Sequence, residues 1–138
     1  MLVYFFIDAA WAAAILDPML RRAVDVSFNM LSVDTDTSTS DTCAIMANGQ
    51  AAPVDTAAFA APLTAGCVHM TEMLTRDGEG ATKLLRATVD GAMTADEARE
   101  SARSLINPPL IKTMAYGSDL PPATSRRTRR TTRHNTDD

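Results

Sequence analysis

The sequence predicts an α+β domain in which helices cover one face of a mixed sheet. The run Leu2–Ile7 is continuously apolar, with aromatic and β-branched residues, as in a strand buried on both faces. Apolar residues recur at helical spacing after Asp17 and after Asp55. Hydrophobic residues make up 46% and charged residues 22% of the 138, which is ordinary for one globular domain. Alanine supplies much of the apolar content, so we expect a thin core.

The segment Asp8–Leu16 is ambiguous, although its alanines would suit a helical turn. A clearer helix start is Asp17-Pro18, because Asp is a good N-cap and Pro suits the first helical position. The helix is expected to run to about Asn29. Its apolar residues recur every four positions, at Leu20, Val24 and Phe28. A short strand is predicted at Leu31–Val33. A second strand is predicted at Thr42–Ala47, although a buried helix of that length would show the same pattern.

A long helix is predicted from about Asp55, another N-cap candidate. Its apolar stripe consists of Phe59, Leu63, Cys67, Met70 and Leu74. The charged, glycine-containing segment Arg76–Gly80 ends it, and Thr82–Asp90 is predicted to be a strand. At the start of the next helix, Thr94 and Glu97 form a capping box, in which each side chain bonds to the backbone amide of the other residue.

The last predicted helix restarts at Asn107-Pro108 and stops at Gly117. Its inward-facing residues are Leu110, Ile111 and Met114. Residues 1–119 therefore form the predicted domain. Residues 120–138 are polar, rich in Arg and Thr and without apolar periodicity, so we expect a basic, disordered tail. Five arginines and two aspartates lie in this tail, which leaves residues 1–119 with 8 basic and 15 acidic side chains. That excess argues against a general nucleic-acid binder.

The two cysteines, Cys43 and Cys67, lack the spacing of a zinc site, and the segment from Cys67 to His69 is too short to be one. We expect both to be buried and reduced in a cytoplasmic protein. Asp8 interrupts the N-terminal apolar run, and no positively charged segment precedes that run. Neither a signal peptide nor a membrane span is therefore predicted.

The segment from residue 34 to residue 42 is a polar loop with three carboxylates, those of Asp34, Asp36 and Asp41, and six hydroxyls. Such residues bond to nearby backbone groups and favour a tight, self-bonded loop. A calcium-binding EF-hand would need glycine and a carboxylate where this chain has Thr39 and Ile45. A hydroxyl nucleophile would need a base beside it, but the two histidines are predicted on a helix and in the tail. We therefore expect no metal and favour a self-bonded loop over a nucleophile.

The sequence Gly78-Glu79-Gly80 is the better candidate for a binding site. Glycines on both sides let the backbone turn sharply and approach a ligand closely. A carboxylate presented there can hold an ammonium group by a charge-assisted hydrogen bond. The alternative is an ordinary turn between a helix and a strand, with a solvated glutamate. Lys83 is either a charge partner of this site or an exposed side chain.

Three segments of the chain resemble the bifunctional ornithine/glutamate N-acetyltransferases of arginine biosynthesis. Residues 28–49 read FNMLSVDTDTSTSDTCAIMANG, residues 77–83 read DGEGATK, and PLIKT at 109–113 is followed by GSD at 117–119. The segments occur in the family's order and at similar spacing, and the resemblance covers residues 1–119. Two residues depart from it, because Thr35 stands where the family has glycine and Ser40 where it has asparagine.

The resemblance implies an αββα-type sandwich built from two chains that arise by self-cleavage before a threonine. That threonine, the attacking group, would lie just before Met1, so no catalytic residue is expected in this chain and the chain alone is expected to be inactive. By the same resemblance, Glu79 is expected to contact the acetylated amino-acid substrate. The residues expected to shape the site are Asp34, Asp36, Ser38, Asp41, Gly78, Gly80 and Lys83.

By the same resemblance, the full enzyme moves acetyl from N-acetylornithine to glutamate through an acetyl-threonine. No cofactor is expected, and some members also accept acetyl-CoA as a donor substrate. The expected partners are the two amino-acid substrates, the upstream chain of the same enzyme and further copies in a higher oligomer, without membrane or nucleic acid. The alternative is a non-catalytic α+β association module with a basic tail. Beyond Asp119 the sequence no longer resembles the family. A reading-frame change after Asp119 would explain this departure, and a genuine basic arm is the alternative.

Overall fold

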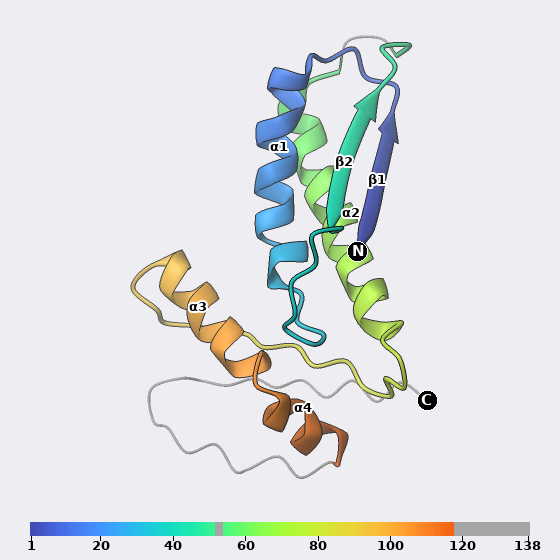
Figure 1. Cartoon of the computed structure of the whole chain (residues 1–138). Helices are drawn as coiled ribbons and strands as arrows, with labels where there is room; N and C mark the ends of the chain where they lie inside the picture. Colours follow the sequence, from blue (N-terminus) through green and yellow to red (C-terminus); the bar gives the residue numbers. More distant parts are fainter. Residues whose placement is uncertain (52–53, 118–138) are drawn as a thin grey trace. The chain divides into compact units, whose positions relative to one another are not determined.

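The computed structural model describes residues 1–51 and 54–117 and confirms the α+β fold class (Figure 1). These residues form two compact units. The first comprises Met1–Leu31 and Asp36–Thr71, and the second comprises Ser32–Thr35 and the described part of Glu72–Asp138. The tail predicted at 120–138 lies outside the described residues.

The first unit is built on two parallel strands, β1 (Leu2–Ile7) and β2 (Thr42–Ala47), which agree with the predicted ranges. Their register pairs Leu2 with Thr42 and Ile7 with Ala47. Parallel strands need a crossover connection, and the helix α1 (Ala13–Asp25) lies in it. Among the described residues these two strands make up the sheet, which is therefore parallel there rather than mixed.

The two faces of this sheet differ in burial. Val3 is 2% exposed, whereas its neighbours Leu2, Tyr4 and Phe6 are 65%, 48% and 76% exposed. Side chains alternate between the faces of a strand, so one face is covered and the other is not. In Figure 1, α1 and the first part of the next helix run alongside the strands. The prediction that β1 is buried on both faces is wrong for the described chain, because nothing in the first unit covers the outer face.

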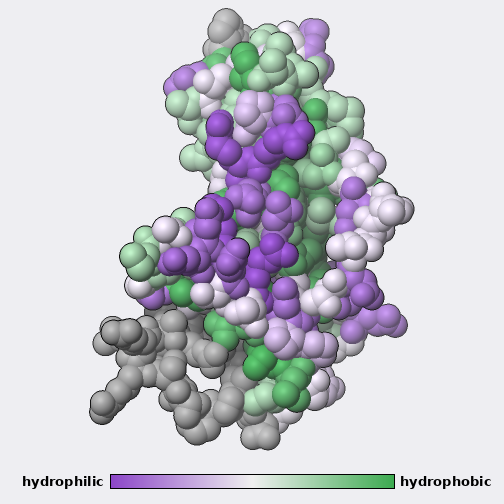
Figure 2. All heavy atoms as spheres, turned by 60° about the vertical axis from the view of Figure 1, so that its left-hand side comes forward, coloured by the Kyte–Doolittle hydropathy of each residue, from purple (hydrophilic) through white to green (hydrophobic). Residues whose placement is uncertain are grey.

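The helix α1 begins earlier than predicted, with Ala12 rather than Asp17 as its N-cap. The run of alanines before Asp17 extends the helix backwards because alanine has the highest helix propensity. Its buried residues are Leu16, Met19 and Ala23. Asp17 lies within the helix and accepts a 2.8 Å hydrogen bond from Arg21 one turn later, which lowers the pKa of Asp17. Figure 2, which turns the α1 side of the molecule forward, shows hydrophilic side chains gathered on this face.

The strand predicted at Leu31–Val33 does not form. After α1 the chain makes a 3-10 helix, η1 (Phe28–Met30), and the amide of Leu31 donates to the carbonyl of Phe28. The buried hydroxyl of Ser27 donates to the carbonyl of Ala23 at 2.6 Å, which fixes the end of α1. Buried Phe28 anchors the turn that follows. These local bonds compete with an extended backbone at this point.

The helix α2 (Thr56–Arg76) agrees with the helix predicted from Asp55. The carboxylate of Asp55 accepts a 3.1 Å hydrogen bond from the amide of Ala57, as an N-cap does. Leu63 and Cys67 are its buried residues. No helix in the described ranges combines the length and the apolar character needed to cross a membrane.

The second unit contains the helices α3 (Ala95–Ile106) and α4 (Pro109–Tyr116), both close to the predicted ranges. The hydroxyl of Thr94 accepts a 3.1 Å hydrogen bond from the amide of Glu97. The return bond of the predicted capping box goes to the amide of Met93, not to that of Thr94. Leu110 was expected to face inward but is 68% exposed, while Ala115 is the buried residue of α4.

The strand predicted at Thr82–Asp90 is also absent from the described structure. A strand needs a hydrogen-bonded partner, and the sheet of the described residues consists of β1 and β2 alone. Side chains hold this segment instead. Arg86 forms an ion pair with Glu72, and Lys83 bonds to the end of α4.

The thiols of Cys43 and Cys67 are expected to make the folded chain less stable at alkaline pH. Burial raises the pKa of both thiols. The charge of Cys43 raises the pKa of Cys67 further, whereas a hydrogen bond with Ser27 lowers the pKa of Cys67. The unfolded chain therefore loses thiol protons at a lower pH than the folded chain. We expect the free energy of unfolding to fall as pH rises through the ordinary thiol value of 9.0. Urea unfolding from pH about 7 to about 10 measures this fall. A Cys67→Ala variant should lose less stability over the same interval, and an equal loss would contradict the assignment.

Candidate functional site

The polar segment 34–42 and the two residues before it, called the acidic loop from here on (residues 32–42), contain a strained backbone position at Thr35. Its φ is 72°, in the left-handed region, and no other non-glycine residue in the described ranges has a positive φ. For a β-branched residue this conformation is an outlier because the side chain approaches the backbone. The neighbouring side chains of Asp34, Asp36 and Ser38 are exposed.

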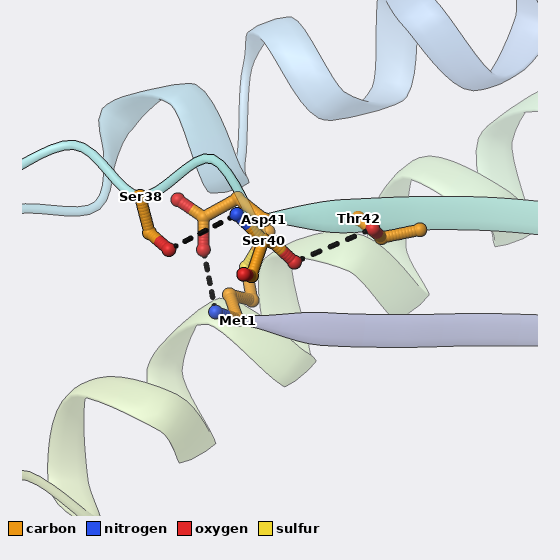
Figure 3. A network of polar contacts seen from close by, with 5 residues as sticks. All are labelled: Met1, Ser38, Ser40, Asp41 and Thr42. Carbon is orange, nitrogen blue, oxygen red and sulfur yellow. Dashed lines mark hydrogen bonds and ion pairs between the residues drawn. The ribbon is translucent and has the colours of Figure 1, made fainter.

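The end of the acidic loop lies beside Met1, the residue that precedes β1 (Figure 3). Asp41 Oδ1 accepts a 2.5 Å hydrogen bond from the backbone nitrogen of Met1. The amide of Thr42 donates to the carbonyl of Met1 at 3.0 Å. This placement follows from the register, because Asp41 directly precedes Thr42, the partner of Leu2. The parallel ladder thus brings together two residues that are 40 positions apart.

Ser38 folds the loop onto itself. Its Oγ accepts a 3.1 Å hydrogen bond from the amide of Ser40, and its carbonyl accepts one from the amide of Asp41 at 3.4 Å. The hydroxyl of Thr42 donates to the carbonyl of Ser40 at 3.4 Å (Figure 3). These bonds agree with the predicted self-bonded loop. Within the part of the chain that the structure describes, no group of three or more His, Cys, Asp or Glu side chains could hold a metal ion.

Glu79 stands at the corner of a tight turn after α2. The amide of Ala81 donates to the carbonyl of Gly78 at 2.9 Å, which closes a four-residue turn. Gly80, at the third position, has a φ of 71°. Type II turns require such a positive φ at this position, and glycine adopts it without strain. Glu79 occupies the second position and is exposed. The predicted sharp turn is therefore present, and the contact of Glu79 with a substrate stays a prediction.

Lys83 bonds to the backbone at the end of a helix. Its Nζ donates to the carbonyl of Ala115 at 3.0 Å and to that of Tyr116 at 3.1 Å. The last carbonyls of a helix lack partners within it, and a cation there is favourable. Lys83 thereby ties the segment after the Glu79 turn to α4. Of the two alternatives for Lys83, the merely exposed side chain is therefore wrong, and its role as a charge partner of the Glu79 site stays a prediction.

Lys112 makes a second such connection, which sequence reasoning did not single out. Its Nζ donates to the carbonyl of Val33 at 2.6 Å and to the hydroxyl of Ser32 at 3.0 Å. Lys112 belongs to α4 and to the segment PLIKT. Its place in that segment was the available signal, but the sequence does not show that its partners lie at the start of the acidic loop.

The predicted site residues are divided between the two units. The second unit holds Asp34, Gly78, Glu79, Gly80 and Lys83, and the first holds Asp36, Ser38 and Asp41. Within the second unit, the two lysines of the chain link the segment after Glu79, the helix α4 and the start of the acidic loop. In the second unit, the exposed carboxylate of Glu79 on its glycine turn suits recognition of a cationic group.

Comparison with known proteins decides the family. The sequence pattern of the ArgJ family matches residues 1–122. The chain belongs to the ArgJ family. It is 50% identical over 119 residues to the arginine biosynthesis bifunctional protein ArgJ 2 of Clostridium acetobutylicum. It is 40% identical over 119 residues to the glutamate N-acetyltransferase Oat2 of Streptomyces clavuligerus.

Both comparisons match 86% of this chain but only 31% and 30% of the two relatives. The chain therefore spans about a third of the length of these ArgJ-family proteins. The crystal structure of the arginine biosynthesis bifunctional protein argJ from Bacillus halodurans is also similar, with a TM-score of 0.78 and 31% identity. That match covers 86% of this chain and 59% of the solved chain, which supports the α+β architecture.

Replacing Thr35 by glycine, the residue of the resembling ArgJ-family segment, is expected to stabilise the chain. The left-handed backbone costs a β-branched residue about 1–2 kcal/mol. The added freedom of glycine in the unfolded chain cancels about 0.4–1 kcal/mol of this gain. The mid-range difference is about 0.8 kcal/mol, so we expect Thr35→Gly to raise the melting temperature by about 2–5 °C.

Thr37→Gly is the matched control, because Thr37 lies in the same loop without a positive φ. It should lower the melting temperature, since it adds only unfolded-state freedom. A melting temperature for Thr35→Gly at or below that of Thr37→Gly would refute the assignment of strain to Thr35.

Proposed function

We propose that this chain is part of an acetyltransferase that moves acetyl from N-acetylornithine to glutamate in arginine biosynthesis. In this enzyme the chain supplies a residue that binds the substrate. The turn at Glu79 carries this proposal, because it presents an exposed carboxylate at a glycine-flanked corner. The names of the relatives, a glutamate N-acetyltransferase and bifunctional proteins of arginine biosynthesis, support the reaction class. Since the chain spans about a third of their length, we place the rest of the site in segments outside it.

Glu79 binds the end of the substrate that does not react. N-acetylornithine carries its acetyl group on the α-nitrogen, and its side-chain amine remains a free ammonium group. The carboxylate of Glu79 holds this ammonium by a charge-assisted hydrogen bond. Binding at this remote end orients the acetyl carbonyl for attack and contributes to catalysis without any covalent step at Glu79.

The acetyl group moves in two steps. A threonine hydroxyl attacks the acetyl carbonyl, a C–O bond forms, the C–N bond breaks, and ornithine leaves with the hydroxyl proton. The amine of glutamate then attacks the acetyl-threonine, a C–N bond forms, the C–O bond breaks, and the threonine oxygen regains a proton. We place this threonine in the segment that precedes Met1. The bond between Asp41 and the backbone nitrogen of Met1 supports this, because it brings the polar loop to that point.

The upstream chain of the same enzyme is the proposed partner, together with further copies in a higher oligomer. The exposed apolar face formed by Leu2, Tyr4, Phe6 and Met46 supports an association, since such faces on a sheet are usually covered. We place the enzyme in the cytoplasm, with acetyl-CoA as an alternative donor substrate and no resident cofactor. The described structure alone would also suit a non-catalytic association module, for which the same apolar face is the supporting observation.

An acetyl-transfer assay on the purified chain tests the proposed function. N-acetylornithine and glutamate are supplied, and ornithine release is measured with and without a co-expressed upstream segment of the ArgJ family. We expect transfer only when the upstream segment is present. A folded complex of both parts without transfer would overturn the acetyltransferase proposal and favour the association module. Transfer by the chain alone would overturn the placement of the threonine.

A further inference from the structure

The ammonium group of Lys112 is directed at the start of the acidic loop. It donates to the carbonyl of Val33 at 2.6 Å and to Oγ of Ser32 at 3.0 Å. The hydroxyl of Ser32 donates in turn to the carbonyl of Ile106, at the end of α3, at 3.4 Å. Ser32 is therefore bonded to both α3 and α4, and Val33 is bonded to α4. Because the donor is charged, the bonds of Lys112 are stronger than neutral ones.

The bonds of Lys112 lie next to the strained part of the loop. Thr35, with its φ of 72°, follows Val33 after one intervening residue, Asp34. A backbone in so sparsely populated a region persists only where the surrounding structure fixes it. The side chain of Val33 is exposed, so apolar packing contributes little to holding this point. The hydrogen bond from Lys112 to the carbonyl of Val33 is then one of the forces that hold it.

We infer that Lys112 is a positioning residue, which holds Ser32–Thr35 in the strained conformation that presents the carboxylate of Asp34 to the substrate. This inference rests on the proposed function, because it assigns Lys112 to the same site. Lys112 touches neither the substrate nor the reacting atoms. It acts through the loop, and Lys83 fixes the segment after Glu79 to the same helix.

The hydrogen bonds from Lys112 to Ser32 and Val33, called the clamp from here on, can be tested on the chain as it exists, without any assay of activity. Lys112→Met removes the ammonium group and keeps an apolar stem of similar length, and Lys112→Arg keeps a charged donor. Asp-N endoproteinase, which cuts before aspartate, reports access to the loop at Asp34 and Asp36. We expect cleavage there to become about 10-fold faster in Lys112→Met, because release of the loop opens it locally. Cleavage in Lys112→Arg should stay close to that of the unchanged chain.

Two internal comparisons separate loop release from general unfolding. Cleavage before Asp8, which follows β1, should not change in Lys112→Met. Arg103→Met removes an exposed basic side chain from α3 and should leave cleavage at Asp34 and Asp36 unchanged. Cleavage that rises equally at all of these sites would mean that the chain unfolds, and equal rates in Lys112→Met and the unchanged chain would refute the clamp.

The positioning role is tested in the chain combined with its upstream segment. At a temperature where all variants are folded, we expect Lys112→Met to lower kcat/KM for N-acetylornithine by about 10-fold and Lys112→Arg to restore it. Faster cleavage at the loop with unchanged kcat/KM would overturn the positioning role and leave a structural clamp. If the unchanged chain shows no transfer at all, the proposed function fails and the positioning role fails with it, while the cleavage result still decides the clamp.

Discussion

Replacing Glu79 with glutamine is expected to lower kcat/KM for N-acetylornithine by about 10- to 100-fold in the chain combined with its upstream segment. Glutamine keeps the shape of the side chain but loses the charge that we propose binds the ammonium group. A hydrogen bond to a charged group contributes about 1.5–3 kcal/mol, which corresponds to this range. The measurement is the rate of ornithine release at several concentrations of N-acetylornithine. Fold and stability should not change, because Glu79 is exposed on its turn.

Glu100→Gln is the matched control, since Glu100 is an exposed glutamate on α3 outside the predicted site. A second control uses N-acetylnorvaline, which lacks the side-chain amine. With this substrate the unchanged protein should already be slow, and Glu79→Gln should lower the rate no further. If Glu79→Gln slows both substrates by the same factor, Glu79 does not bind the ammonium group.

Leu63→Ala is expected to lower the free energy of unfolding by about 2–5 kcal/mol. Leu63 is 5% exposed on the face of α2 that packs in the first unit. Its truncation leaves a cavity that neighbouring side chains fill only in part. Small domains are stabilised by about 5–15 kcal/mol in total, so this change removes a large share. Urea unfolding monitored by circular dichroism measures it.

Leu110→Ala is the control for this change, because it makes the same substitution on another helix at a residue that is 68% exposed. We expect Leu110→Ala to change stability by no more than about 0.5 kcal/mol. A larger effect for Leu110→Ala than for Leu63→Ala would reverse the assignment of the buried and exposed faces.

The elements that the sequence predicted well have strong local signals. The strands β1 and β2 are short, continuous apolar runs, and α2 combines the N-cap Asp55 with a long apolar stripe. The start of α1 was missed because Asp17-Pro18 resembles a helix start, whereas the preceding alanines continue the helix. The predicted strand at Thr82–Asp90 failed for another reason. A strand depends on a partner, which a local pattern cannot supply.

In the candidate site too, features with a local sequence signal were predictable and long-range contacts were not. The turn at Glu79 was predictable, because glycines on both sides are a local signal for a sharp turn. The contact of Asp41 with Met1 joins residues 40 positions apart, and that of Lys112 with Ser32 joins residues 80 positions apart. Such contacts depend on strand register and on how helices pack. The strain at Thr35 was visible in the sequence only as a departure from the family's glycine, without its physical meaning.

Mass spectrometry of the acetylated enzyme tests the central claim most directly, namely that this chain supplies the substrate side of an acetyl-transfer site and not the attacking group. The chain combined with its upstream segment is incubated with N-acetylornithine in the absence of glutamate, so that an acetyl-enzyme accumulates. We predict one acetyl group on the threonine that precedes Met1 and none on the hydroxyls of the acidic loop, including Ser38. Acetyl found on one of those hydroxyls, and removed when glutamate is added, would contradict the account.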